Sequence, residues 1–197
     1  DHPIYKRIHS NYMSDIDLFC AINQTPIIAV TGTNGKTTVT HMIKVGLESK
    51  GLKVKMGGNQ ATSALDLLDD QSADVVVLEL SSFQLCHSTS SRFALGVVTN
   101  IAPDHVKWHH SFDHYKASKM KLDHFSDQFM FMENTNHAIH EKNQMTAIKA
   151  CHMFGVEVDV NTIKKVRLPH RQETFFKNGI QWVNDSKATN VAATKAL

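Results

Sequence analysis

The sequence predicts an α/β fold: a doubly wound, mostly parallel β-sheet followed by a C-terminal β-hairpin. From residue 26 onward, apolar runs of strand length alternate with segments of helical periodicity. The run at residues 73–80 is almost continuously apolar, which is typical of a parallel strand covered on both faces. Near the C-terminus, Asn178-Gly179 separates two arms rich in β-branched and aromatic residues, the signature of a type I′ hairpin turn.

The predicted elements follow one another in a β-α-β order, which favours parallel pairing of the strands. Gly51 follows the first helix as a C-terminal cap residue does. The hairpin occupies residues 174–183, and no internal repeat is found. The expected strands are residues 27–31, 52–56, 73–80, 93–99 and 128–132, and the expected helices are residues 36–50, 61–68, 113–125 and 137–150.

Bulk composition excludes several functional classes. A formal net charge of +2 over 197 residues gives no case for nucleic acid as a partner. No apolar run approaches the roughly 18 residues that a membrane span needs. The three cysteines are odd in number and show no C-x-x-C spacing, so we expect a reduced, cytoplasmic protein with the cysteines as small buried residues.

The most informative segment follows the first strand, where a glycine turn leads directly into a helix. Gly32 and Gly35 allow the backbone to approach phosphates, and the helix N-terminus directs its free N–H groups at them. Lys36 supplies positive charge and Thr37 a hydroxyl for Mg²⁺. The strict P-loop pattern requires glycine at Val30, so this is a variant loop. A chance lysine after an ordinary strand–turn–helix is the disfavoured alternative.

Polar residues also follow the later strands, where ligands of open α/β sheets bind. Asn59 comes after Gly57-Gly58, and a simple turn explains it as well as a ligand contact does. Glu79 ends an apolar strand and is either a Mg²⁺ ligand or a carboxylate facing water. His105 follows the fourth strand as a candidate metal ligand or general base.

For three further groups of residues, sequence spacing alone does not decide between a structural and a functional role. We expect His109 and His110 to be ordinary surface histidines, because their spacing does not match zinc sites and no thiolate is near in sequence. Lys116 and Lys119 lie at i and i+3, which by itself indicates a solvated basic face. The last group is Arg171, Asp185 and Lys187. The arginine and the lysine could bind phosphates, and the aspartate could accept hydrogen bonds from ribose hydroxyls.

Taken together, four motifs resemble the Mur ligase superfamily, whose members use ATP to join amino acids to cell-wall or folate precursors. Two of them, Ser-Ser-Phe-Gln-Leu and Asp-Ser-Lys-Ala-Thr-Asn, resemble the branch that adds D-glutamate to UDP-N-acetylmuramoyl-L-alanine. The resemblance extends over most of the chain. The motifs, in order, are Gly-Thr-Asn-Gly-Lys-Thr-Thr (32–38), Glu-Leu-Ser-Ser-Phe-Gln-Leu (79–85), Leu-Pro-His-Arg (168–171) and Asn-Asp-Ser-Lys-Ala-Thr-Asn (184–190).

This resemblance implies a role for each candidate residue. The catalytic set is Lys36, Lys119 and His105, and the metal ligands, for two Mg²⁺ ions, are Thr37, Glu79, His105 and Lys119. In this family the lysine at the position of Lys119 is carbamylated by CO₂, which turns a cation into a carboxylate. The implied ATP contacts are Thr33, Asn34, Gly35, Lys36, Thr37, Thr38, Arg171, Asp185 and Lys187, and the implied substrate contacts are Asn59, Ser81 and Gln84.

The resemblance also implies the reaction. The substrate carboxylate attacks the γ-phosphate of ATP, and the amine of D-glutamate then displaces phosphate from the acyl phosphate. No side-chain nucleophile is needed, which agrees with the lack of a Ser-His-Asp or Cys-His set. The implied partners are small-molecule substrates, with no nucleic acid and no membrane, and the implied state is a monomer.

The domain division departs from that of the family. Residues 1–24 resemble the tail of an N-terminal UDP-binding domain and a linker, 25–190 the central ATP-binding domain, and 191–197 the start of a missing C-terminal domain. The central domain reads as internally shortened near 156–168, which would leave part of its core uncovered. The alternatives are therefore an inactive or nucleotide-binding-only remnant, or another Mur-superfamily amide ligase. We expect no turnover from these residues alone.

Overall fold

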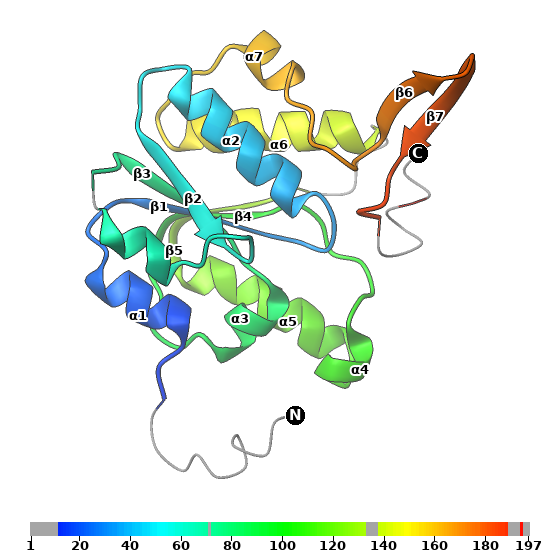
Figure 1. The fold of residues 1–197 in the computed structure, drawn as a ribbon. Coiled ribbons are helices and arrows are strands. Elements are labelled where there is room, and N and C mark those ends of the chain that lie inside the picture. Colours follow the sequence, from blue (N-terminus) through cyan, green and yellow to red (C-terminus); the bar gives the residue numbers. More distant parts are fainter. Residues whose placement is uncertain (1–11, 71, 133–137, 189–193, 195–197) are drawn as a thin grey trace.

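A central parallel sheet organises the molecule in the computed structural model, which describes residues 12–70, 72–132, 138–188 and 194. Five parallel strands lie in the order β2-β3-β1-β4-β5, with helices on both faces (Figure 1). The α/β fold and the mostly parallel sheet are therefore confirmed. The strands are β1 (Ile27–Thr31), β2 (Val54–Gly58), β3 (Val75–Glu79), β4 (Phe93–Val98) and β5 (Ser126–Phe131).

The central strand β1 is buried along its whole length, which accounts for its unbroken apolar sequence. Successive side chains of a strand point to opposite faces. Ile28 and Val30 accordingly pack in one apolar cluster with α2, and Ile27 and Ala29 in a second cluster with α1. The core thus has two layers, one on each side of the sheet.

The first face of the sheet is covered by α2 (Lys36–Glu48), α6 (Ile139–Met153) and α7 (Val160–Lys164). Ile163 of α7 is fully buried, and its side chain lies so close to Gly46 of α2 that a Cβ there would meet it at 2.9 Å. Val158 and Val166 pack against the same cluster. On this face α6 and α7 cover the core, and the predicted internal shortening near 156–168 stays a prediction.

The opposite face carries α1 (Asp15–Ile22), α3 (Ser82–His87) and α5 (Phe112–His124), with the single turn α4 (Val106–His109) before α5. The helix expected at 61–68 is wrong, since only a 3₁₀ turn, η2 (Leu65–Asp69), forms there. α2 follows β1 on one face, whereas α3 and α5 follow β3 and β4 on the other. The carboxyl end of β1 therefore lies at a topological switch point, the usual ligand position in such sheets.

The C-terminal hairpin forms as the sequence predicts and extends away from the body of the molecule (Figure 1). Strands β6 (Glu173–Lys177) and β7 (Ile180–Asn184) pair antiparallel. Asn178 and Gly179 have φ of 54° and 74°, as a type I′ turn requires. Within the described residues, no helix is both long and apolar enough to cross a membrane.

Candidate functional site

The loop after β1 has a backbone that only glycine accommodates at two positions. Gly32 has φ 150°, and a Cβ there would lie 1.9 Å from the Thr99 hydroxyl oxygen. Gly35 caps the N-terminus of α2 in the left-handed region, with φ 81°. Because no side chain caps this end of α2, its first N–H groups face the concave side of the loop.

The end of β4 holds this loop in place through a set of hydrogen bonds. The backbone N–H groups of Thr33 and Asn34 donate to the Asn100 carbonyl and side-chain oxygens at 2.9 Å and 3.0 Å. The Thr99 hydroxyl and the Asn100 amide donate to the Asn34 carbonyl at 2.7 Å and 2.8 Å. Sequence reasoning missed Asn100, whose position directly after a predicted strand was the available signal.

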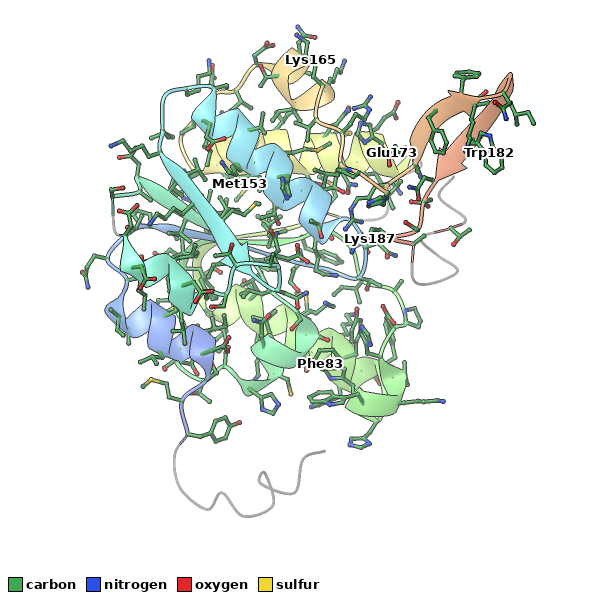
Figure 2. All side chains as sticks on the ribbon, in the orientation of Figure 1. Phe83, Met153, Lys165, Glu173, Trp182 and Lys187 are labelled. Atoms are coloured by element: carbon green, nitrogen blue, oxygen red, sulfur yellow. The ribbon has the colours of Figure 1, made fainter. Side chains whose placement is uncertain are left out.

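A cavity of about 260 Å³ opens in front of the loop and gathers residues that are far apart in sequence. All the residues expected to contact ATP line it: Thr33, Asn34, Gly35, Lys36, Thr37, Thr38, Arg171, Asp185 and Lys187. Asn59 and Glu79 line it as well. In Figure 2, Lys187 lies beside the N-terminal end of α2, although it comes from the segment after the hairpin.

Residues of α6 and the segment after α7 complete the cavity wall, and sequence reasoning missed them. His140 and Asn143 lie at i and i+3 on α6, and Arg167 precedes the Leu-Pro-His-Arg motif. The Asn143 side chain lies against Gly35, where a Cβ would meet its oxygen at 2.4 Å. A polar pair at i and i+3 is ordinary on an exposed helix, so the sequence carried no distinguishing signal for these two residues.

The charges around the cavity are mixed, with cations in excess. The Lys36 ammonium donates to the Thr33 carbonyl at 2.9 Å. Burial lowers the pKa of Lys36, the carboxylates of Glu79 and Asp104 raise it, and Arg171 lowers it. Glu79 is 3% exposed and accepts a hydrogen bond from the Gln60 amide at 2.9 Å.

A smaller cavity of about 100 Å³ adjoins the first, and Thr33, Lys36 and Asn59 line both. Ser81, His105 and Lys119 line only the smaller one. His105 is an exposed residue with φ 50°, and its ring is tilted against the ring of Phe83 with the centroids 5.0 Å apart. Gln84 lines neither cavity, because its side chain accepts from the Ser81 backbone N–H and hydroxyl in the capping box of α3.

Lys119 lies at the bottom of the smaller cavity and is only 2% exposed, so the solvated-face interpretation is wrong for this residue. Its ammonium donates to the Gly32 carbonyl at 2.8 Å and lies 4.9 Å from the centre of the Tyr115 ring. Burial first, and the nearby Lys36 cation second, lower the pKa of Lys119 to about 7 against the opposing effect of Asp104 and Glu79. Lys116, in contrast, is exposed as expected.

His109 also departs from expectation. His110 is exposed, but His109 is 1% exposed and its Nε2 lies 2.9 Å from the Ser82 hydroxyl oxygen. Burial first, and then the charges of His114 and other nearby cations, lower the pKa of His109 to about 4. The prediction of a surface histidine is therefore wrong for His109, because the single turn α4 places it between α3 and α5.

Comparison with known proteins gives one consistent result. Residues 30–189 match the model of the Mur ligase middle domain. The UDP-N-acetylmuramoylalanine–D-glutamate ligase of Buchnera aphidicola is 32% identical over 252 positions, covering 98% of this chain and 57% of that protein. The enzyme of the same name from Sphingopyxis alaskensis is 35% identical over 243 positions, covering 98% and 55%. Since this chain has 197 residues, both relatives carry residues within the aligned region that it lacks.

Solved structures agree on the fold. MurF from Acinetobacter baumannii superposes with a TM-score of 0.72 at 14% identity, covering 89% of this chain and 54% of that one. MurF from Thermotoga maritima, solved in complex with ADP, superposes with a TM-score of 0.68 at 16% identity. The match covers 90% of this chain and 60% of that one. The chain thus spans little more than half the length of the relatives it matches. On its matched domain, its fold and its relatives, the chain belongs to the Mur ligase family.

Proposed function

We propose that this chain provides the ATP site of a ligase that adds D-glutamate to UDP-N-acetylmuramoyl-L-alanine. The observation that carries the proposal is that two segments about 130 residues apart, 32–38 and 168–188, line one cavity at the switch point of the sheet. Lys36, Arg171 and Lys187 supply the positive charge that a triphosphate needs. The names of the relatives at 32% and 35% identity support D-glutamate as the amino acid.

Magnesium fits the oxygen donors at this cavity. Thr37 offers a hydroxyl at the start of α2, and Glu79 a carboxylate that is buried at the edge of the cavity. A buried carboxylate is stable only with a hydrogen-bond partner, a counter-charge or a metal ion, and Mg²⁺ prefers such hard oxygen ligands. We assign Thr37 and Glu79 to one Mg²⁺, which would neutralise charge on the phosphates. His105 and a carbamylated Lys119 are proposed for a second.

The chemistry of Lys119 suits carbamate formation. CO₂ reacts with a neutral amine, and a lysine whose pKa is about 7 is substantially neutral at physiological pH. Loss of the ammonium charge removes the repulsion from Lys36, which is one of the causes of the low pKa. The carbamate would place a negative charge in the smaller cavity beside His105.

The two adjoining cavities suggest how the reactants are arranged. The γ-phosphate end of ATP would lie near Lys36, which lines both cavities, and the substrate carboxylate would enter past Ser81 and Asn59. The carboxylate oxygen attacks the γ-phosphorus, ADP leaves, and the amine of D-glutamate displaces phosphate from the acyl carbon and loses a proton to solvent. The contribution of the protein is positioning and charge neutralisation by Lys36 and Arg171. A monomeric, cytoplasmic enzyme acting on small molecules is part of this proposal.

Binding of ATP·Mg²⁺ to the chain, followed by calorimetry, tests the nucleotide site. We expect saturable binding that Lys36→Ala weakens by at least about tenfold, since a charged hydrogen bond contributes roughly 1.5–3 kcal/mol. Failure to bind ATP would refute the nucleotide site. It would favour the alternative that the chain is an inactive remnant of a ligase. A variant of Lys50, an exposed lysine at the other end of α2, serves as the control.

Phosphate release with UDP-N-acetylmuramoyl-L-alanine, ATP and D-glutamate tests the reaction. Because the chain spans just over half of its relatives, we expect binding without turnover. Turnover that requires D-glutamate and is lost in Lys36→Ala would contradict this expectation and establish the full reaction in these residues. Turnover with another amino acid, or with a folate precursor, would favour another Mur-superfamily amide ligase.

A further inference from the structure

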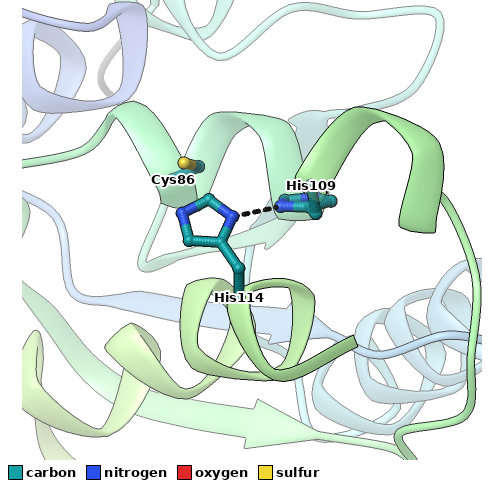
Figure 3. Close-up of side chains that lie close together, drawn as sticks. All are labelled: Cys86, His109 and His114. Atoms are coloured by element: carbon teal, nitrogen blue, oxygen red, sulfur yellow. Dashed lines mark hydrogen bonds between the residues drawn. The ribbon is translucent and has the colours of Figure 1, made fainter. Parts of the chain in front are cut away.

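A second cluster of metal-binding side chains lies on the side of α3 and α5, away from the ATP cavity. Cys86 of α3, His109 of α4 and His114 of α5 lie side by side, and a hydrogen bond joins the two histidine rings (Figure 3). These atoms all lie within 4.8 Å of one another. We propose that Cys86, His109 and His114 form a binding site for a zinc-class divalent cation, independent of the proposed ligase function.

The two histidines already have the separation that a tetrahedral ion imposes. Their Nδ1 atoms lie 3.2 Å apart and share a hydrogen bond, which a bound ion would replace. Zn–N bonds of 2.0–2.1 Å at a tetrahedral angle place two nitrogen ligands about 3.3 Å apart. A thiolate with a Zn–S bond of 2.3 Å would lie about 3.6 Å from each nitrogen. The Cys86 Sγ lies within 4.8 Å of the two nitrogens, so the proposal requires this half-buried side chain to move closer when the ion binds.

The surroundings of His109 orient its ring for this role. Its Nε2 lies 2.9 Å from the buried Ser82 hydroxyl oxygen, which accepts the ring N–H in the tautomer protonated at Nε2. In that tautomer the unprotonated Nδ1 faces His114. Histidine ligands to metals almost always donate their second ring N–H to a neighbouring oxygen, which fixes the ring orientation. Ser82 would therefore be an outer-shell partner of the ion.

The ligand set selects the ion and explains what it would do. One thiolate and two imidazoles suit Zn²⁺ rather than Mg²⁺, which requires oxygen ligands. His114 is exposed and gives the ion a path from solvent, and binding releases the Cys86 thiol proton to solvent. The ion would join α3, α4 and α5. The ring of Phe83, which lines the smaller cavity, stacks on His109 at 5.6 Å. The site would therefore stabilise that wall of the cavity.

Cobalt titration of the untagged, reduced chain tests the site, because Co²⁺ reports both thiolate ligation and tetrahedral geometry. The titration is carried out without nucleotide and with excess Mg²⁺, so that oxygen sites are occupied. We expect one equivalent of Co²⁺ to give a thiolate-to-cobalt charge-transfer band and strong visible bands, both lost on adding Zn²⁺. Zn²⁺ should also raise the melting temperature.

Single substitutions separate this site from adventitious binding by the other histidines. Cys86→Ser should abolish the charge-transfer band, and His114→Ala should weaken Co²⁺ binding by more than about a hundredfold, beyond the roughly 10–100-fold cost of losing an outer-shell partner. His110→Gln and Cys20→Ser are matched controls that should bind as the parent chain does. Circular dichroism of each metal-free variant reports folding. No charge-transfer band in the parent chain, or one that persists in Cys86→Ser, would overturn the proposal.

Discussion

At the scale of single residues, Gly32 shows how strictly the phosphate loop is specified. Its φ of 150° and the Thr99 hydroxyl 1.9 Å from a built Cβ exclude any side chain. Gly51 provides a control, because its φ of 85° also favours glycine but nothing lies within 4 Å of its Cβ. We expect Gly32→Ala to lower the free energy of unfolding by about 1–3 kcal/mol more than Gly51→Ala and to abolish ATP binding. Urea unfolding and calorimetry measure both, and equal costs for the two variants would contradict the steric argument.

The second prediction at this scale concerns Lys119. At a fixed concentration of dissolved ¹³CO₂, carbamate requires neutral amine, and the neutral fraction rises as the pH passes upward through about 7. We therefore expect a ¹³C carbamate resonance that grows between about pH 6 and pH 8. It should vanish in Lys119→Arg and persist in Lys116→Arg, the exposed lysine one turn earlier. A resonance that survives in Lys119→Arg would assign the carbamate to another amine.

At the scale of elements, one buried carboxylate joins α1 to the loop before β4, in addition to the apolar contacts of Ile16 and Phe19. Asp17 is 1% exposed and accepts from the backbone N–H groups of Thr89 and Ser90 and from the Ser91 hydroxyl. Burial raises the pKa of Asp17, but the hydrogen bonds from Ser91, Ser90, Thr89 and Ser14 outweigh it and lower the pKa from 3.8 to about 2. The charged form is therefore the form that the fold stabilises.

Asp17→Asn should lower the free energy of unfolding by about 2 kcal/mol at pH 7. Since the folded pKa is depressed, this contribution is present above the unfolded value of 3.8 and is lost as the pH falls toward 2. The difference between the parent chain and the variant should thus shrink below about pH 4. Asp15→Asn, an exposed residue in the same turn, should cost less than about 1 kcal/mol. Urea unfolding at several pH values distinguishes the two.

Some helices and strands could be predicted from the sequence, and others could not. Strands β1, β3 and β4 and the hairpin follow from apolar runs and Asn178-Gly179, because burial on both faces and a two-residue turn leave plain local signals. α1, α3 and α4 were missed, since helices of four to eight residues carry too little periodicity and are held by contacts such as those of Asp17. The burial of His109 was missed for the same reason.

At the scale of the whole molecule, the candidate site exists only because distant segments meet. The sequence motifs identified the P-loop and the 168–188 segment, yet no local pattern shows that α6 supplies His140 and Asn143 to the wall between them. The family resemblance, rather than periodicity, singled out Lys119, whose burial depends on how α5 packs beneath the loop. The predicted domain limits stay predictions, because both ends of the chain lie largely outside the described structure: residues 1–11, 189–193 and 195–197.

This long-range assembly can be tested at Arg171, which approaches the P-loop from the opposite end of the sequence. Its charge lowers the pKa of Lys36, so the two cations lie near enough to act on one ligand. We expect Arg171→Ala to weaken ATP·Mg²⁺ binding by about 1.5–3 kcal/mol and to reduce its salt dependence. Arg92→Ala, an exposed arginine before β4 at the other end of the sheet, should leave affinity unchanged. Calorimetry at two salt concentrations provides the measurement. If Arg171→Ala bound ATP as tightly as Arg92→Ala, nucleotide binding would depend on the P-loop alone, and the 168–188 segment would have no part in it.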